Sequence, residues 1–253
     1  MSFMPLVLTY AVTPVHVGTG RSPGIVDLPF QRDSIGYPIV YGSSFKGVLK
    51  SLLINKDSKE FANKDSEEFA KCVFGAEPED PDKYMGRFIV TDLIPVFYPI
   101  ASLLDGYVYV STDYLIKKAE DILSVVGGGT NNNIYKKNEG EEVNILLLGK
   151  LKSSYTLTLT ETVKETVKGI GSLIKDKVYV FDNDIGLQIV ESSLIRVTRN
   201  VLDDNKKTSQ NLWTEEYLPQ GTVFIGGIID AKRTNKSCED VGDVDNIFRQ
   251  NLD

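Results

Sequence analysis

Histidine, cysteine and long apolar runs are scarce in this sequence, and each shortage excludes a class of site. His16 is the single histidine among 253 residues, so no metal or catalytic site can use two imidazoles. Cys72 and Cys238 are the two cysteines and neither belongs to a C-x-x-C pair, which excludes a cysteine-rich zinc site and a disulfide framework. No apolar run approaches the roughly 20 residues that span a bilayer, and no basic leader with a cleavage site opens the chain. We therefore expect a cytoplasmic protein without a membrane partner.

Acidic residues exceed basic ones, but the excess is local. The formal net charge is −7, which taken alone argues against binding nucleic acid. Residues 1–56 carry five basic side chains against two acidic ones, whereas residues 57–82 carry nine acidic side chains against three lysines. A basic surface can therefore coexist with the acidic total. Hydrophobic residues make up 42% of the chain and charged residues 25%, which is typical of a globular domain.

Strand-like and helix-like patterns alternate along the chain. Two helices are expected, one after Gly42 with Ser43 or Ser44 as its cap, and one over 112–126 with Thr112 as its cap and Gly127 as its stop. Their apolar stripes are Phe45, Val48, Leu49, Leu52 and Leu53, and Leu115, Ala119, Ile122, Leu123 and Val126. Strands are expected at 4–15, 88–97, 144–148, 150–159, 178–181 and 222–229. This order predicts an α+β fold.

Three polar segments interrupt these elements. Residues 57–82 are acidic and contain proline, so we expect a surface insertion there. Residues 127–133 combine glycine and asparagine, as a flexible loop does. Residues 194–201 and 211–217 flank the polar tip at 203–207 and are expected to form the two strands of an extended β-hairpin. Its basic residues Arg196 and Arg199 suit a nucleic-acid groove, although a solvated hairpin would have the same composition.

Two glycine-containing motifs are suited to phosphate. Gly18-Thr19-Gly20-Arg21 follows the first strand, where glycines let a phosphate approach backbone N–H groups; a plain tight turn is the alternative. Gly42-Ser43-Ser44-Phe45-Lys46-Gly47 places hydroxyls, N–H groups and an ammonium at a helix N-terminus, which favours anions. Lys50 follows Lys46 by one turn on the same helix. A serine-capped helix with solvated lysines is the alternative here.

Asp27 is the carboxylate with the most unusual surroundings. It lies in the apolar run Val26-Asp27-Leu28-Pro29, between Arg21 and Arg32. Such an aspartate can orient a nucleophile or hold a divalent cation, and it can also simply form a turn. His16 has three open roles, as a core histidine, an RNA contact or an acid/base group.

The order of these motifs resembles a known family. His16 to Arg21, Gly24 to Arg32, Tyr37-Pro38-Ile39 and Gly42 to Gly47 together resemble the N-terminal half of RAMP proteins of CRISPR effector complexes. Within them, the V-D-L-P-x-Q-R run, here Val26 to Arg32, is similar to the fourth, repeated backbone subunit of the type III-B (Cmr) complex. The resemblance covers about residues 5–230. The glycine-rich C-terminal segment usual in the family is not found after residue 230.

The resemblance implies a single RAMP domain over 1–253, with an RRM-like (ferredoxin-like) palm, helical insertions and the 186–217 hairpin as a thumb. It implies an RNA endonuclease of CRISPR antiviral defence that acts in a ribonucleoprotein with guide crRNA, target RNA, further copies of itself and other Cmr subunits. Asp27 matches the cleavage aspartate, and a divalent metal ion, Mg or Mn, is implied with ligands unknown. The residues expected to contact RNA are His16, Gly18, Gly20, Arg21, Gln31, Arg32, Ser43, Ser44, Lys46, Lys50, Arg196 and Arg199.

The sequence leaves two alternatives open. The chain can be a backbone subunit without catalysis, in which Asp27 only orders its loop. It can also be the equivalent subunit of the related Csm complex, a subunit that usually lacks the V-D-L-P-x-Q-R motif. Measuring cleavage by a complex with altered Asp27 distinguishes the endonuclease from the subunit without catalysis. The identity of the co-purifying subunits distinguishes a Cmr subunit from a Csm subunit.

Overall fold

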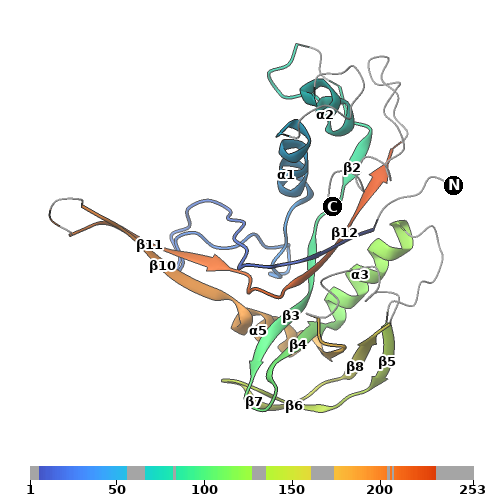
Figure 1. The fold of residues 1–253 in the computed structure, drawn as a ribbon. Helices are drawn as coiled ribbons and strands as arrows, with labels where there is room; N and C mark the ends of the chain where they lie inside the picture. The colour runs from blue at the N-terminus through green and yellow to red at the C-terminus, as the bar shows by residue number, and fades with distance from the viewer. Residues whose placement is uncertain are drawn as a thin grey trace.

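The computed structural model describes residues 6–55, 66–81, 84–126, 135–160, 174–203, 206 and 208–231, and it confirms the predicted α+β class. A curved mixed sheet forms the centre of the molecule (Figure 1). Its strands lie in the order β1 (Leu6–Tyr10), β12 (Val223–Asp230), β3 (Ile94–Ser102), β4 (Gly106–Thr112), β9 (Lys177–Phe181), β8 (Tyr155–Leu159) and β5 (Tyr135–Glu139). β2 (Phe88–Val90) also pairs with β12. β4 and β9 are parallel, and the other pairs in this sheet are antiparallel.

Helix α3 (Asp113–Val126) confirms the prediction for its start and its buried face. Thr112 Oγ1 accepts a hydrogen bond from the Leu115 N–H at 3.3 Å, as the predicted cap requires. Leu115, Ala119 and Val126 are buried, because the helix packs on the sheet. A Cβ at Gly227 of β12 would lie 2.4 Å from Val126 Cγ2, so glycine there lets the helix approach the strand closely. The predicted stop at Gly127 and the 127–133 loop lie outside the described residues.

Helix α1 (Gly42–Asn55) begins earlier than predicted and buries two of the five residues of the predicted stripe. Leu49 and Leu53 are buried, whereas Val48 and Leu52 are exposed, since helix α2 (Ser66–Phe74) covers only one side of α1. The prediction that Ser43 or Ser44 caps this helix is wrong, because both lie inside its first turn.

The segment predicted as an acidic surface insertion is in part a packed helix. Phe69, Val73 and Phe74 of α2 are buried with Leu49 in a second hydrophobic cluster. The prediction of a surface segment over 57–82 is therefore wrong for residues 66–74. Their apolar side chains recur at helical spacing among the acidic residues and form one buried face of a helix. Cys72 is buried in the same cluster.

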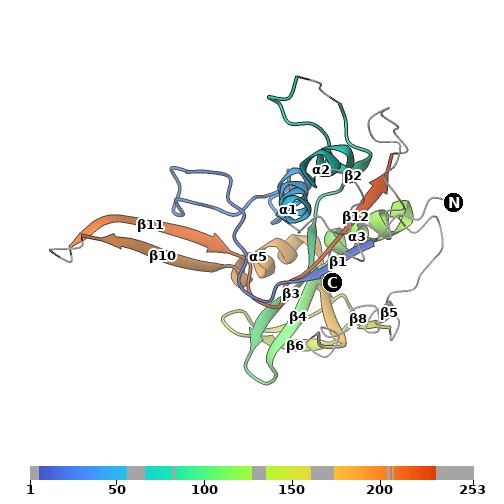
Figure 2. The ribbon, with the colours of Figure 1, turned by 45° about the horizontal axis from the view of Figure 1, so that its top comes forward.

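The projecting hairpin is shorter than the thumb that the resemblance implied. Residues 186–193 belong to helix α5 (Asn183–Ser193), whose Ile189 and Val190 are buried in the main core. The hairpin itself consists of β10 (Ile195–Leu202) and β11 (Ser209–Tyr217), which pair antiparallel and project from the body of the molecule (Figures 1 and 2). The strands predicted at 194–201 and 211–217 are therefore confirmed to within two residues, whereas the range 186–217 that the resemblance implied for the thumb begins too early, because residues 186–193 are helical.

Two smaller differences concern strands. The strand predicted over 88–97 is divided into β2 and β3, and the strand predicted over 150–159 is likewise divided, between Lys152 and Tyr155. β12 confirms the strand predicted over 222–229. The pair β6 (Glu142–Ile145) and β7 (Gly149–Lys152) forms a separate hairpin. No helix within the described ranges combines the length and the apolar composition needed to cross a bilayer.

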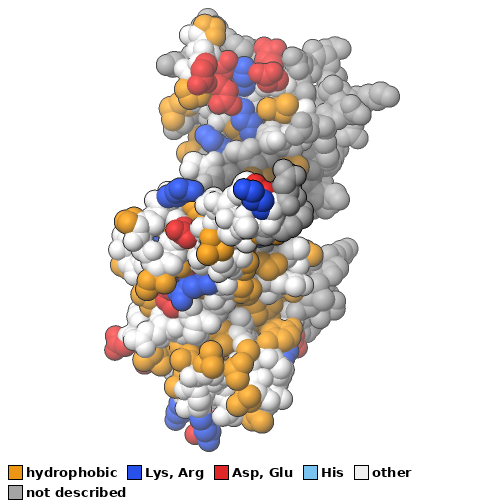
Figure 3. Space-filling view, turned by 90° about the vertical axis from the view of Figure 1, so that its left-hand side faces the viewer, with side chains coloured by type: hydrophobic (Ala, Val, Ile, Leu, Met, Phe, Trp, Pro, Cys, Tyr) orange, Lys and Arg blue, Asp and Glu red, His pale blue; other side chains and the backbone are white. Residues whose placement is uncertain are grey.

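Seen from the side toward which the hairpin projects, the surface divides into zones (Figure 3). Acidic side chains gather at the end formed by α2 and its following loop. Hydrophobic side chains are prominent at the opposite end. Leu103 and Leu104 in the β3–β4 turn and Leu147 in the β6–β7 turn are exposed. Lys and Arg side chains lie between these zones, around the hairpin.

Candidate nucleic-acid interface

Asp27 lies against the edge of β11 that faces away from β10. Its Oδ2 accepts a hydrogen bond from the Thr214 N–H at 2.7 Å. The next residue, Leu28, donates to Thr214 O at 3.0 Å and accepts from the Glu216 N–H at 3.1 Å, so the loop runs parallel to β11 like a third strand. A turn closed by the Ser22 N–H on Asp27 O at 2.8 Å precedes it. Asp27 is therefore fixed at the root of the projecting hairpin. We call residues 16–32 and 213–217 the junction.

His16 and the glycine turn lie on the same junction. His16 Nδ1 lies 2.6 Å from Glu216 O. A carbonyl can only accept, so Nδ1 carries the proton and Nε2 is left as an acceptor in the neutral ring. A Cβ at Gly18 would lie 2.9 Å from that Nε2, which explains glycine at this position. Gly20 has φ +93°, and Arg21 beside it is exposed. The predicted turn thus presents backbone and one guanidinium to solvent.

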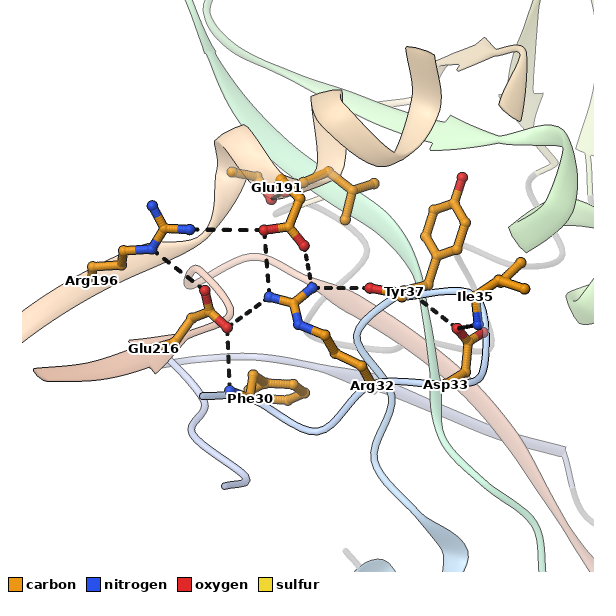
Figure 4. Close-up of polar contacts among 11 residues, drawn as sticks. Phe30, Arg32, Asp33, Ile35, Tyr37, Glu191, Arg196 and Glu216 are labelled. Atoms are coloured by element: carbon orange, nitrogen blue, oxygen red, sulfur yellow. Dashed lines mark hydrogen bonds and ion pairs between the residues drawn. The ribbon is translucent and has the colours of Figure 1, made fainter. Parts of the chain in front are cut away.

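Arg32 belongs to a cluster of ion pairs at the root of the hairpin (Figure 4). Its guanidinium pairs with Glu191 of α5 and lies 2.7 Å from Glu216 Oε2. Glu216 is 2% exposed, and its Oε2 also accepts from the Phe30 N–H at 3.2 Å. Arg196 lies 3.5 Å from Glu216 Oε1 on the outer side. Because a buried carboxylate needs a cation, Arg32 serves first to join the loop, α5 and β11.

Asp33 anchors the next part of the loop to α3. Its Oδ1 accepts from the Tyr37 N–H at 2.9 Å, and its Oδ2 accepts from Tyr114 Oη at 2.7 Å and from Lys118 Nζ at 3.0 Å. Burial opposes ionisation of this carboxyl, but the hydrogen bonds from Tyr114 and Lys118 outweigh it and lower the pKa of Asp33. The loop is consequently held at both ends, with Asp27 toward the hairpin.

The N-terminus of α1 already has an anionic partner within the chain. Asp92 Oδ1 accepts from the Gly42 N–H at 2.7 Å, a contact that sequence reasoning missed because 50 residues separate the two. Ser43 is exposed, and Ser44 Oγ lies 3.4 Å from Gln31 Nε2. Gln31 also accepts from the Tyr41 N–H at 3.2 Å, so it connects the loop to this helix. The first turn of α1 is thus adjacent to the junction.

The two lysines of α1 have different surroundings. Lys50 Nζ donates to Gly75 O at 2.9 Å and lies 2.5 Å from Glu77 Oε1, and its side chain is 12% exposed. Lys46 is half-buried and makes no ion pair within the described part of the chain. The structure therefore leaves the Lys46 ammonium available to a phosphate, whereas Lys50 holds the loop after α2.

One face of the hairpin carries a row of interacting side chains. Residues 213, 215 and 217 share this face because strand side chains alternate. Glu215 accepts from Trp213 Nε1 at 2.7 Å and from Tyr217 Oη. Arg199, directly opposite Trp213, donates to Tyr217 Oη at 2.8 Å and to Glu215 at 3.3 Å. These hydrogen bonds, Tyr217 first and Trp213 second, lower the pKa of Glu215.

This row continues onto the palm. The ring of His16 lies 5.2 Å from that of Tyr217, centroid to centroid. Trp213 and Tyr217 were not among the predicted site residues. The alternation of Trp, Glu and Tyr along the strand indicates that these side chains share one face, and it could have been used to predict them. Of the predicted residues, the structure brings His16, Asp27, Arg32, Arg196 and Arg199 together, and it places Lys50 elsewhere.

The described residues do not form a complete metal site. No group of three or more His, Cys, Asp or Glu side chains suited to a metal ion occurs among them. Asp27 is a hard oxygen ligand, but one of its oxygens already accepts a backbone hydrogen bond. These residues alone thus do not fit the divalent ion that the resemblance implied.

Comparison with known proteins gives consistent matches. Residues 10–251 match the model of the RAMP superfamily. The CRISPR system Cmr endoribonuclease Cmr4 of Pyrococcus furiosus is 28% identical over 90% of this chain and 82% of that protein. The CRISPR system CMR subunit Cmr4 of Saccharolobus solfataricus is 26% identical over 87% and 82% of the two chains. A chain in the type III-B Cmr-beta complex bound to cognate target RNA has a TM-score of 0.71 and 25% identity, covering 98% of this chain and 88% of that chain.

Proposed function

Because this chain belongs to the RAMP superfamily, we propose that it is the repeated backbone subunit of a type III-B (Cmr) CRISPR effector complex. In this role it binds guide crRNA and cuts complementary target RNA at regular intervals. Its partners are both RNAs, further copies of itself and other Cmr subunits, and it acts in the cytoplasm. The relatives named Cmr4 and the similar chain in a complex with target RNA support this assignment over the Csm alternative.

One observation supports cleavage most directly: a carboxylate, Asp27, is fixed at the root of a projecting hairpin. A carboxylate beside an RNA phosphate is electrostatically unfavourable unless it transfers a proton or holds a cation. Asp27 is therefore suited to orient or deprotonate the attacking hydroxyl, which is either an internal 2′-OH or water. Exposed Arg21, six residues earlier, is suited to hold the phosphate.

RNA binding itself is proposed to be directed at the backbone. Arg21, Lys46 and Ser43, together with the glycine turn, offer a guanidinium, an ammonium, a hydroxyl and main-chain groups, none of which reads a base. Arg32 and Arg196 contribute by keeping the hairpin and the loop in place. Affinity should therefore fall steeply with salt and depend little on guide sequence.

The divalent ion stays a prediction. The described residues do not hold one by themselves, and the proton transfer assigned to Asp27 does not require one. Chelation with EDTA followed by addition of Mg²⁺ or Mn²⁺ measures whether cleavage requires an ion.

The test of catalysis is Asp27→Asn in the assembled complex. Asparagine keeps the size of the side chain and can still accept from the Thr214 N–H, so guide and target binding should persist. Target cleavage should fall by about 100-fold to 10,000-fold, the range for a lost general acid–base group. Thr13→Ala, in the exposed segment after β1, is a matched control that should cut normally. Cleavage by Asp27→Asn at the normal rate would instead establish a non-catalytic scaffold.

A further inference from the structure

Asp92 closes the end of α1 at which the sequence predicted a phosphate contact. Its Oδ1 accepts a hydrogen bond from the Gly42 N–H at 2.7 Å, so the first amide of the helix is already bound. A Cβ at Gly42 would lie 2.4 Å from Val90 O, because the helix begins against the end of β2. Figures 1 and 2 show α1 beside β2. A phosphate therefore cannot approach this helix along its axis.

The Asp92 carboxylate is fixed in place and still exposed. On one side of it, Leu93 and Val40 exchange backbone hydrogen bonds at 2.9 and 3.1 Å. On the other side, the Thr91 N–H donates to Gly227 O at 2.9 Å, and the Thr91 hydroxyl accepts from the Gly227 N–H at 2.8 Å. Asp92 is exposed, and within the described part of the chain its Oδ2 has no hydrogen bond or ion pair. One carboxylate oxygen is therefore available to a ligand that donates a hydrogen bond.

The side chains of α1 that are proposed to bind the RNA backbone follow directly on this contact. Ser43, next to Gly42, is exposed, and Lys46 lies about one turn further along the helix, with no ion pair to any described residue. A carboxylate at this place repels the phosphates of RNA and DNA alike. A hydrogen bond from a sugar hydroxyl offsets that repulsion, and the 2′-hydroxyl is the group by which a protein distinguishes RNA from DNA. An exposed carboxylate beside backbone contacts thus favours RNA.

We propose that Asp92 selects RNA over DNA by accepting a hydrogen bond from a ribose 2′-hydroxyl on its Oδ2. This inference rests on the proposed RNA-binding function and adds to it a residue that determines the type of sugar. With RNA, a charge-assisted hydrogen bond compensates for the nearby phosphates. With DNA, the repulsion is left without compensation. The Gly42 N–H sets the orientation of the carboxylate, and no base is read.

Three short oligonucleotides of one sequence test this role: RNA, DNA and 2′-fluoro RNA. The 2′-fluoro RNA keeps the sugar pucker of RNA but has no 2′ hydrogen-bond donor, so it separates the donor from the shape of the strand. Anisotropy of a 5′ fluorophore measures the affinity of each for the full chain carrying Asp27→Asn, which prevents cutting and is called the parent. We expect the parent to bind RNA about tenfold more tightly than the other two, the fold-change that one hydrogen bond to a charged group contributes.

Asp92→Asn in the parent is the decisive variant. Asparagine keeps an oxygen for the Gly42 N–H, but an NH₂ group that cannot accept replaces Oδ2. The ratio of the RNA affinity to the 2′-fluoro RNA affinity should therefore fall about tenfold from that of the parent. Affinity for DNA and 2′-fluoro RNA should rise, because the repulsion is removed. A purely structural role of Asp92 would instead change all three affinities by the same factor.

Asp105→Asn is the matched control, since it changes the net charge equally at a distance. Asp105 is exposed in the β3–β4 turn, beyond the nine residues of β3. At about 3.3 Å per residue it lies roughly 30 Å from Asp92, which is about three Debye lengths at 0.1 M salt. Its affinity ratio should match that of the parent.

The outcomes separate this inference from the proposed function. Equal affinity of the parent for RNA and 2′-fluoro RNA, or an Asp92→Asn chain with the ratio of the parent, would overturn the role of Asp92 and leave backbone-directed binding intact. If none of the three oligonucleotides binds, the proposed RNA-binding function fails and this inference with it. The comparison of the three on the parent needs no substitution at Asp92, so a variant that fails to fold does not prevent the test.

Discussion

Replacing Arg32 with methionine removes the nearest cation from a buried carboxylate. Arg32 Nη2 lies 2.7 Å from Glu216 Oε2, and the Glu216 side chain is 2% exposed. The remaining cation, Arg196, lies 3.5 Å from Oε1 and its side chain is 54% exposed. Glu191, which Arg32 also pairs with, is 33% exposed and can be rehydrated. The cost of the substitution therefore arises mainly at Glu216.

The size of this cost follows from the burial of the pair. Two unit charges about 4 Å apart attract by about 4 kcal/mol at an effective dielectric constant of about 20, and desolvation cancels much of that in the intact pair. Removing one partner of a buried pair costs about 3–5 kcal/mol. Arg32 is 27% exposed and Arg196 remains, so we expect about 3 kcal/mol for Arg32→Met. Glu216→Gln should cost less, about 1.5 kcal/mol, because Arg32 keeps Glu191 and reaches water.

Urea unfolding of the full chain, followed by circular dichroism, measures these free energies. The double variant Arg32→Met/Glu216→Gln should be more stable than the sum of the two single costs predicts, with a coupling of about 1–2 kcal/mol. Arg196→Met is the control and should cost less than about 1 kcal/mol, since exposed ion pairs contribute little. Additive single costs, or an Arg196→Met variant as unstable as Arg32→Met, would refute the assignment of Arg32 as the partner of the buried charge.

Three further predictions follow from single contacts. The pKa of Asp33 is lowered despite its burial, so its contribution to stability is complete above about pH 5 and is lost as the pH falls through the lowered pKa. Unfolding measured against pH should therefore show the deficit of Asp33→Asn, about 2 kcal/mol at pH 7, shrinking below pH 5. Thr112→Val removes the cap of α3 and should cost about 1 kcal/mol in thermal or urea unfolding, a cost that Thr112→Ser should largely avoid. In RNA titrations across salt concentrations, Lys46→Ala should reduce the slope of log affinity against log salt by about 1, whereas Lys50→Ala, ion-paired within the chain, should not change it.

Local patterns in the sequence were sufficient for the elements that depend on neighbouring residues. The stripe of Leu115, Ala119 and Val126 and the cap at Thr112 lie within one helix, and the structure confirms them. The hairpin strands and β12 were also predictable, because alternation and turn composition are local signals. The α+β class follows from their order. The resemblance to RAMP proteins likewise depended on motifs with short spacing, and the family match confirms it.

Pairing between distant residues is what only the tertiary structure decided. Arg32, predicted as an RNA contact, pairs with carboxylates 159 and 184 residues away, and no periodicity relates them. The partner of Asp27 is a backbone N–H 187 residues further along the chain. The buried helix at 66–74 was not predicted, because its charged exposed residues and its apolar buried residues alternate within the same nine residues and the segment as a whole has an acidic composition. A sequence specifies which side chains carry charge, but the packing of segments determines whether each charge meets solvent, RNA or another side chain.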